Sequence, residues 1–200
     1  MTQSASSVLL IRPTGFGYDS ETAASNGFQQ RLEREDIRER AEQEFDDLLN
    51  ALRHCGIPVT VLDPVDPAAP NAVFPNNWLS THADGTVVTY PMCTPSRRVE
   101  RDPAIAEVLR REGFSVRQVM DLSPWEEKGL FLEGTGSLVL DRVKRLAFAV
   151  LSPRTHASAL NGWCEQLGYV PVPFTATMDG TLSGQPIYHT NVVMSIGLHF

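Results

Sequence analysis

The chain has 200 residues, of which 42% are hydrophobic and 20% charged, a composition that suits one globular domain or part of a larger one. Its net charge of −7 argues against a nucleic-acid partner, which requires clustered Lys and Arg. No apolar run approaches the roughly 20 residues needed to span a membrane. The three cysteines are an odd number without a CxxC motif, which predicts free thiols in a reducing cytoplasm.

The first part of the chain predicts a strand, a loop, a long helix and a second strand. The apolar run Val8–Pro13 predicts a buried strand, and residues 14–30, rich in Gly, Ser and Asn, predict a loop. Within residues 30–55 the later apolar positions follow helical spacing, and Gly56 is a natural helix stop. Residues 57–61 then alternate as a strand.

The rest of the chain predicts two complete hairpins and the start of a third. The hairpin strands are 78–82 with 86–90 and 137–141 with 145–151, and residues 186–200 begin the third hairpin. A helix and a strand follow each complete hairpin, over 102–111 and 114–119, and over 153–167 and 169–175. The predicted unit is therefore strand–strand–helix–strand, which indicates a mixed α/β fold with short antiparallel sheets.

Three copies of one pattern run down the chain. Each copy has a helix end, a glycine and an alternating strand, as in LRHCGIPVTVLDP at 52–64, LRREGFSVRQVMDL at 109–122 and CEQLGYVPVPFTA at 164–176. A fixed period of about 55 residues is typical of repeat architectures, in which no unit can bury its apolar face alone. The sequence therefore predicts part of a ring of repeated units.

Polar residues recur at the mouth of each predicted hairpin. Asn77, Glu133 and His189 follow one another at intervals of 56 residues, with Asn76 and Asn191 close by. Equivalent positions of a cyclic repeat converge on its centre, so we expect these side chains to meet. A carboxylate and carboxamide oxygens suit the N–H donors of a planar guanidinium or urea-like group, and an imidazole can move protons near neutral pH.

Four separated strings carry a resemblance to a known family. In chain order they are RPTGFGYDSETAASNGFQ, FPNNWLSTH, FLEGTGSLVLDR and PIYHTNVVMSIG. From Arg12 to the last residue the chain resembles the guanidino-group-modifying superfamily of arginine deiminases, dimethylarginine hydrolases and amidinotransferases, and it is most similar to the bacterial branch named for citrulline utilisation. The resemblance implies a five-bladed α/β propeller, or pentein. Judged by the repeat period, residues 1–200 would be one incomplete domain with about three blades.

The resemblance also implies roles for the candidate residues. Glu133 of the EG motif would be the carboxylate that binds the substrate, and His189 of the HTN motif would be the catalytic histidine. Asn77 stands where deiminases place an Asp that grips the guanidinium, and Asn76 competes with it for that role. Asn191 stands at the second position of the histidine motif. Because Asn replaces an acidic residue at both positions, a neutral ureido group is allowed as well as a guanidino group.

The implied chemistry is Cys-dependent hydrolysis or amidino transfer, without a metal or an organic cofactor. A Cys thiolate would attack the central carbon of the substrate, and the histidine would protonate the leaving amine and then activate water. In the family this cysteine lies in a Gly-rich segment beyond the length of the present chain. Cys55 and Cys164 are expected to be packing residues. Cys93 is the alternative nucleophile within the chain.

Three interpretations stay open. The protein is an enzyme whose remaining blades lie beyond Phe200 or come from another chain, a non-catalytic remnant that binds a small guanidino or ureido ligand, or a structural α/β module. An open ring would expose the apolar faces of its end blades and the unpaired edge of a strand over 187–197, so we also expect self-association.

Overall fold

A computed structural model describes residues 2–32, 35–181 and 183–198 of the chain. The chain divides into two compact units, which we call the long-helix unit and the hairpin unit. The long-helix unit comprises Ala5–Pro75 and Thr94–Phe114, and the hairpin unit comprises Met1–Ser4, Asn76–Cys93 and Ser115–Phe200. Among the described residues, one two-stranded sheet lies in the former and two three-stranded sheets lie in the latter.

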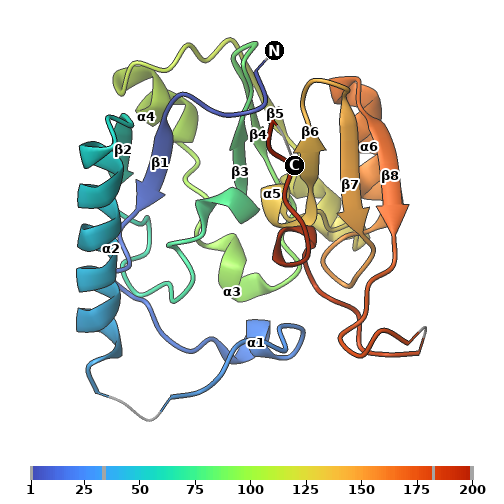
Figure 1. Ribbon diagram of the computed structural model, residues 1–200, viewed down its shortest axis with the longest axis horizontal. Helices are drawn as coiled ribbons and strands as arrows, with labels where there is room; N and C mark the ends of the chain where they lie inside the picture. The colour runs from blue at the N-terminus through green and yellow to red at the C-terminus, as the bar shows by residue number, and fades with distance from the viewer. Residues whose placement is uncertain (1, 33–34, 182, 199–200) are drawn as a thin grey trace. The chain divides into compact units, whose positions relative to one another are not determined.

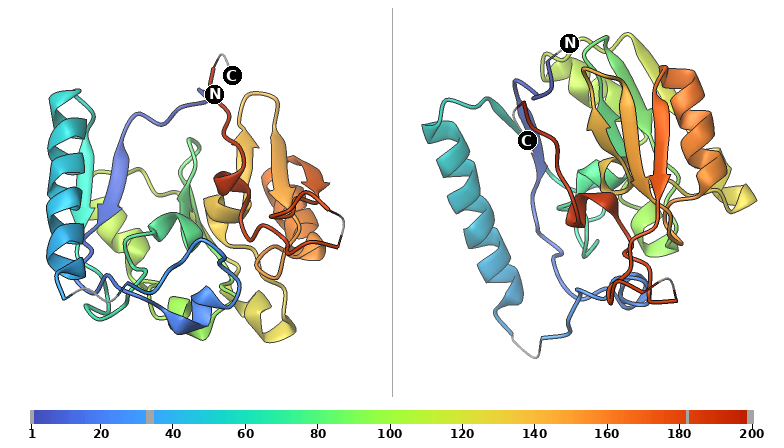
Figure 2. Two further views of the ribbon diagram at one scale, coloured as in Figure 1. Left: turned by 60° about the horizontal axis from the view of Figure 1, so that its bottom comes forward. Right: turned by 45° about the vertical axis from the view of Figure 1, so that its right-hand side comes forward.

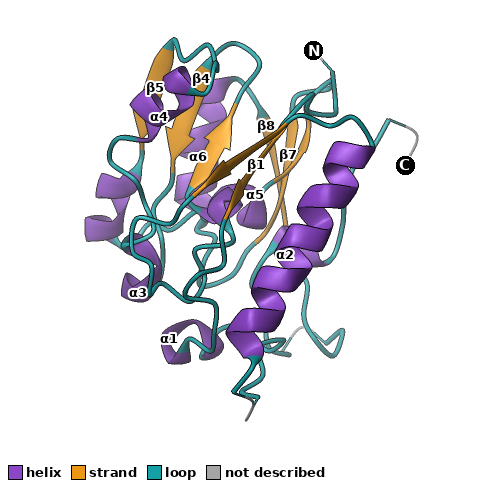
Figure 3. Ribbon diagram, turned by 90° about the vertical axis from the view of Figure 1, so that its left-hand side faces the viewer, coloured by secondary structure: helices purple, strands orange, loops and turns teal. Residues whose placement is uncertain are grey.

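The long-helix unit is built around two parallel strands and a long helix (Figures 1 and 3). They are β1 (Val8–Ile11), α2 (Ile37–His54) and β2 (Val59–Leu62). Phe45 and Leu49 are the buried residues of α2, and their spacing of four places both on one helix face. After α2, Gly56 adopts a φ of 73°, which glycine reaches without a Cβ penalty, and the helix ends there as predicted.

Three short helices complete the long-helix unit: α1 (Ser20–Ala23), α3 (Pro95–Arg98) and α4 (Ile105–Arg111). Buried Asp19 joins α1 and α3 to the loop that carries Asn71. One of its oxygens caps α1, and the other accepts hydrogen bonds from Asn71 Nδ2 at 2.9 Å and Ser96 Oγ at 2.8 Å. The helix predicted from residue 102 begins at Ile105, because the Asp102 side chain turns the chain by accepting from the Ala104 N–H.

The hairpin unit contains the predicted strand pairs (Figures 1 and 2). Its strands are β3 (Leu79–Thr81), β4 (Thr86–Thr89), β5 (Gln118–Asp121), β6 (Val139–Asp141), β7 (Leu146–Val150) and β8 (Val170–Phe174). β3 pairs with β4 and β6 with β7 in antiparallel fashion, and β5 and β8 join as parallel strands. The strand–strand–helix–strand order is therefore confirmed twice, with α4 and α6 (Ala157–Leu167) as the connecting helices.

The prediction of a third hairpin at 186–200 is wrong for the residues that are described. No strand is formed between residues 183 and 198, and the segment instead forms a short 3₁₀ turn, η3 (Thr190–Val192). The reason is side-chain docking: Thr190 Oγ1 donates to Ser137 O at 2.5 Å and accepts from Val150 N at 2.8 Å. These bonds attach the segment beside α5 (Gly134–Ser137) rather than in a strand ladder (Figure 1).

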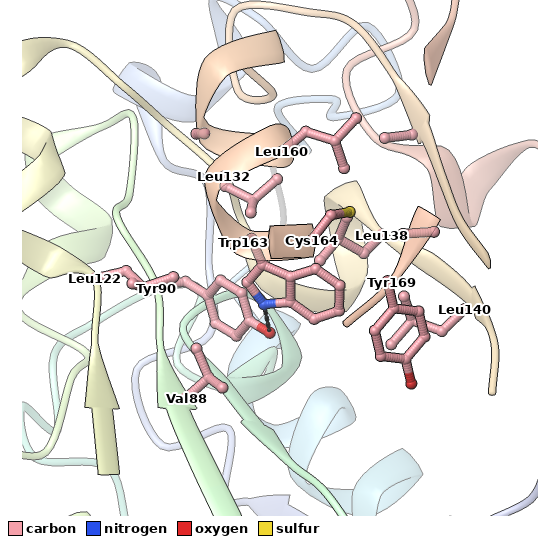
Figure 4. Close-up of a cluster of buried hydrophobic side chains, with 13 residues drawn as sticks. Val88, Tyr90, Leu122, Leu132, Leu138, Leu140, Leu160, Trp163, Cys164 and Tyr169 are labelled. Atoms are coloured by element: carbon pink, nitrogen blue, oxygen red, sulfur yellow. Dashed lines mark hydrogen bonds between the residues drawn. The ribbon is translucent and has the colours of Figure 1, made fainter. Parts of the chain in front are cut away.

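The core of the hairpin unit surrounds Trp163 of α6 (Figure 4). α6 packs along β8 (Figure 2). Its Trp163 indole belongs to a buried cluster with residues of both sheets of the unit. Trp163 Nε1 donates to Tyr90 Oη at 3.0 Å, and Tyr90 Oη lies 2.7 Å from Ser80 Oγ. Burial raises the pKa of Tyr90 to about 12, so its hydroxyl remains protonated, and it joins β3 to α6 through hydrogen bonds.

The structure also has two further 3₁₀ turns, η1 (Pro75–Asn77) and η2 (Ser123–Lys128). Across the described ranges, no helix combines the length and apolarity needed to cross a bilayer. In the same ranges, no three His, Cys, Asp or Glu side chains cluster in a way that could hold a metal ion.

Candidate active site

Glycines at the start of α5 allow the segments of the site to approach one another. Glu133 directly precedes α5, and Gly134 follows it with a φ of 45°. A Cβ at Gly134 would lie 2.2 Å from Asn76 O, so only glycine lets η1 lie against this turn. A Cβ at Gly136 would lie 2.7 Å from the His189 ring and 3.0 Å from Asn77 Oδ1. The side chains of Asn77 and His189 therefore border the same point.

The centre of the site is a buried pair formed by Glu133 and His189. His189 Nε2 lies 2.8 Å from Glu133 Oε2, and the two side chains are 4% and 0% exposed. The other carboxylate oxygen, Oε1, accepts the backbone N–H of Cys93 at 3.0 Å. A buried carboxylate is costly unless it is paired and hydrogen-bonded, and this one is both. With Glu133 ionised, Nε2 is the donor nitrogen of His189, and Nδ1 is the ring nitrogen at the Gly136 and Asn77 side.

Hydroxyl groups fix the three segments of the site to one another. Ser137 Oγ accepts the Glu133 N–H at 2.9 Å and donates to Arg154 O at 3.1 Å. Ser152 Oγ donates to Tyr188 O at 2.8 Å and accepts the Arg154 N–H at 3.1 Å. Together with the Thr190 hydroxyl, these bonds tie the start of α5 to the chain after β7 and to the segment that carries His189. Such connected polar networks hold side chains in one geometry.

The structure separates the sequence candidates into an inner and an outer set. Asn77, Glu133 and His189 are buried and lie together, as the 56-residue spacing predicts. Asn76 is half-buried, and its backbone carbonyl accepts from Thr135 Oγ1 at 3.4 Å. Asn191 is exposed within η3 and lies outside the buried set. The Asn77 carboxamide therefore belongs to the buried set, and the substrate-binding roles of Asn76, Asn77 and Asn191 stay predictions.

Sequence reasoning missed two groups at the site, the Arg154 side chain and the Cys93 backbone. Arg154 Nη1 lies 3.5 Å from Glu133 Oε2, and its side chain is 2% exposed. Residue 154 falls within a predicted helix, but α6 begins at Ala157, so the preceding loop carries Arg154 to the carboxylate. Cys93 follows β4 in the chain, and its backbone N–H reaches Glu133. Neither contact leaves a signal in the sequence, because both join positions far apart along the chain.

Comparison with known proteins gives a family. The family model of "N,N dimethylarginine dimethylhydrolase, eukaryotic" matches residues 12–200. The chain belongs to this family. It is therefore one of the guanidino-modifying pentein proteins, as its four sequence strings suggest. A comparison with curated proteins gives no match.

Solved structures of pentein enzymes have the same fold as this dimethylarginine dimethylhydrolase family member. The substrate-bound N-terminal domain of ArgZ, a cyanobacterial arginine dihydrolase, is 21% identical with a TM-score of 0.64, and the match covers 82% of this chain and 56% of that one. The citrulline complex of a cysteine-to-serine mutant of Pseudomonas aeruginosa DDAH is 14% identical with a TM-score of 0.65, covering 96% and 67%. AgrE with ornithine and NAD⁺ is 22% identical with a TM-score of 0.66, covering 90% and 24%.

These likenesses show an α/β fold of the pentein type, with open sheets. The chain spans only about half the length of the ArgZ domain that it matches, 56%.

Proposed function

We propose that the protein is a hydrolase of the dimethylarginine dimethylhydrolase family that cleaves a C–N bond of an arginine-like or citrulline-like compound. The observation that carries this proposal is the buried Glu133–His189 pair, with 2.8 Å between Oε2 and Nε2, in a chain of this family. Two relatives support the substrate class: ArgZ is an arginine dihydrolase, and the Pseudomonas DDAH mutant binds citrulline. Transfer of the amidino group to another amine is the alternative outcome of the same chemistry.

Each site residue has a role in this proposal. Glu133 orients the substrate by accepting its N–H groups, and the Asn77 carboxamide contacts the same head group. Asn76 and Asn191 are further candidates for contacts to the head group. His189 protonates the leaving amine through Nδ1 and then takes a proton from the attacking water. No metal or organic cofactor takes part.

The proposed nucleophile is a Cys thiolate from outside the 200-residue stretch. It forms a C–S bond with the central carbon, and the C–N bond breaks as the amine leaves with the proton from His189. Water then adds, the C–S bond breaks, and the thiolate is regenerated. Burial raises the pKa of Cys164 to about 11, and Cys55 lies at the end of α2 in the long-helix unit. Cys93 is the alternative, because its backbone reaches Glu133.

The test is a release assay for ammonia and for ornithine or citrulline. It uses the 200-residue chain and a longer version that continues through its native downstream sequence, each with arginine and citrulline as substrates. Activity only in the longer version, lost in Glu133→Gln and His189→Asn, supports the proposal. Activity in the short chain that is lost on Cys93→Ala makes Cys93 the nucleophile. If neither version releases product, but citrulline binds and the binding is lost in Glu133→Gln, the protein is a non-catalytic binding protein.

We extend the proposal to assembly and compartment. The edge strands β5 and β8 expose Val119 at 45% and Val170 at 58%, and open apolar edges favour pairing between copies. We therefore expect concentration-dependent self-association, which sedimentation velocity measures. A compact monomer at all concentrations contradicts this expectation. The three free cysteines support a reducing cytoplasm. We also propose that residues 1–200 form one incomplete propeller domain with about three blades.

A further inference from the structure

We propose that Glu126 of η2 is a positioning residue, which orients Glu133 through the backbone of residues 91–93. We call these three residues the exit segment, because they follow the end of β4. The inference rests on the proposed function in so far as Glu133 is the group that binds the substrate there. The contacts on which it is built belong to the hairpin unit alone.

The exit segment has left the β-sheet, so its backbone N–H groups need other acceptors. Pro91 has no N–H, and Met92 is fully buried, where an unpaired N–H would be costly. The Met92 N–H donates to Glu126 Oε1 at 2.7 Å. The next N–H along the chain, that of Cys93, donates to Glu133 Oε1 at 3.0 Å. Two carboxylates thus bind two successive N–H groups of one short segment.

This arrangement connects Glu126 to the orientation of Glu133. Both oxygens of Glu133 are engaged, Oε1 with the Cys93 N–H and Oε2 with His189 Nε2 at 2.8 Å. The two oxygens belong to one rigid planar group, so a displacement of the Cys93 N–H also displaces the oxygen that faces His189. Glu126 holds the peptide next to that N–H, through Met92. The position of the Glu126 carboxylate therefore sets the geometry of the Glu133–His189 pair.

Other contacts anchor the 3₁₀ turn that carries Glu126. The Trp125 side chain packs against the buried core, and a Cβ at Gly162 of α6 would lie only 3.1 Å from its Cη2 atom. The Trp125 carbonyl also accepts the Leu130 N–H at 3.1 Å. Shortening the Glu126 side chain therefore removes the acceptor of the Met92 N–H while η2 keeps its own anchors.

The chain offers variants that separate hydrogen-bond geometry from charge. Glu126→Gln keeps a side-chain oxygen at the same reach and removes the charge. Glu126→Asp keeps the charge, but its side chain is one methylene shorter. Glu127 is the next residue of η2 and is exposed, so Glu127→Ala removes the same charge from the same turn at a solvent-facing position.

The experiment is amide hydrogen exchange of the full 200-residue chain, followed by nuclear magnetic resonance with ¹⁵N labelling. Glu126→Ala and Glu126→Asp should accelerate exchange of the Met92 and Cys93 amides by about tenfold or more, because a hydrogen bond to a charged acceptor is lost. The same variants should move the ring ¹⁵N signals of His189. Glu126→Gln should recover most of the protection, and Glu127→Ala should match the parent protein.

The Leu160 amide is the internal reference for stability. It donates to His156 O at 3.0 Å at the start of α6, and Leu160 is fully buried. Its exchange reports opening of the core of the same unit. We expect the acceleration in Glu126→Ala to be confined to the exit segment and the Leu160 rate to stay near that of the parent.

Parent-like exchange of Met92 and Cys93 in a folded Glu126→Ala protein overturns the proposal. Equal acceleration at Leu160 also overturns it, because the effect would then follow stability alone. A Glu126→Gln protein as perturbed as Glu126→Ala does so too, because charge and not geometry would then decide. If Glu126→Ala does not fold, Glu126→Asp decides, and parent-like exchange in that variant refutes the inference.

The exchange readout does not depend on turnover. Altered Met92 and Cys93 exchange together with a silent activity assay refutes the proposed function and leaves the positioning role standing. In whichever form of the protein is active, Glu126→Ala should lower kcat/KM by about tenfold, and Glu126→Gln should recover most of it. Activity that requires Glu133 but is unchanged in Glu126→Ala refutes the positioning role and leaves the proposed function standing.

Discussion

Two buried arginine–glutamate pairs among the described residues differ in geometry. Arg97 and Glu100 are three residues apart, and their pair is bidentate, at 2.6 Å for Nε and 2.8 Å for Nη2. Arg154 and Glu133 are 21 residues apart, and Arg154 Nη1 approaches Glu133 Oε2 only to 3.5 Å, because the same oxygen also contacts His189 Nε2. A fork-to-fork pair satisfies its own charges locally. A looser pair that includes a titratable ring fits a site in which a proton moves.

The largest expected effect tests whether Glu133, the partner of Arg154 and His189, takes part in the reaction. Glu133→Gln keeps the size of the side chain and removes the charge that orients His189. We expect turnover of citrulline or arginine to fall by about 10²–10⁴-fold in whichever form of the protein is active. The assay is ammonia release at saturating substrate. Glu100→Gln is the matched control, and an equal loss of activity in both variants would break the distinction between the pairs.

The next effect concerns the stability that the Arg97–Glu100 pair gives to the fold. Arg97→Gln leaves the Glu100 carboxylate buried without its guanidinium, which should cost about 3–5 kcal/mol in free energy of unfolding, measured by urea denaturation. Replacing both residues with apolar ones of similar volume, as in Arg97→Met with Glu100→Leu, should recover most of that loss. A double variant as unstable as the single one would show that the pair has a role beyond charge compensation.

His82 sharpens the comparison as a half-buried histidine whose ring is hydrogen-bonded to a hydroxyl and not to a carboxylate. Its Nε2 lies 3.0 Å from the neutral Ser80 hydroxyl. Burial, helped by Arg142 and Arg145 and opposed by Asp84, lowers the pKa of His82 from 6.5 to about 4. Between these two values the unfolded chain binds more protons than the folded one, so stability falls as the pH drops from 6.5 towards 4.

We expect His82 to contribute about 2 kcal/mol to that loss. Urea denaturation at pH 7 and pH 4.5 measures it, and His82→Gln should flatten the difference by this amount. An unchanged pH slope in His82→Gln would mean that other groups cause the acid sensitivity. Lys144→Gln is a surface control, because its Nζ lies 4.0 Å from Asp141 and is well exposed.

The smallest effect probes the space between Asn77 and His189. Gly136→Ala would place a methyl group 2.7 Å from the His189 ring and 3.0 Å from Asn77 Oδ1, so both side chains must shift. We expect a loss of about 1–2 kcal/mol in unfolding free energy together with altered His189 ring shifts. Gly17→Ala, whose Cβ would come no closer than 3.8 Å to another atom, should change neither. A parent-like Gly136→Ala protein would show that the contact is loose.

The sequence by itself predicted the repeating elements of this fold. The helix ends at Gly56, Gly113 and Gly168 all have a positive φ, and each is followed by a strand. Local backbone preference and side-chain period determine such elements, so they can be derived from short stretches of sequence. The equal spacing of Asn77, Glu133 and His189 also predicted their meeting, because repeated units place equivalent positions alike.

Only the tertiary structure decided which other groups complete the site. The Arg154 guanidinium and the Cys93 N–H reach Glu133 from positions 21 and 40 residues away, outside the repeat period. The third hairpin also failed for a tertiary reason, since the Thr190 hydroxyl binds Ser137 O and Val150 N. Contacts of this kind depend on how whole elements pack against one another, and no local pattern of residue types records that packing.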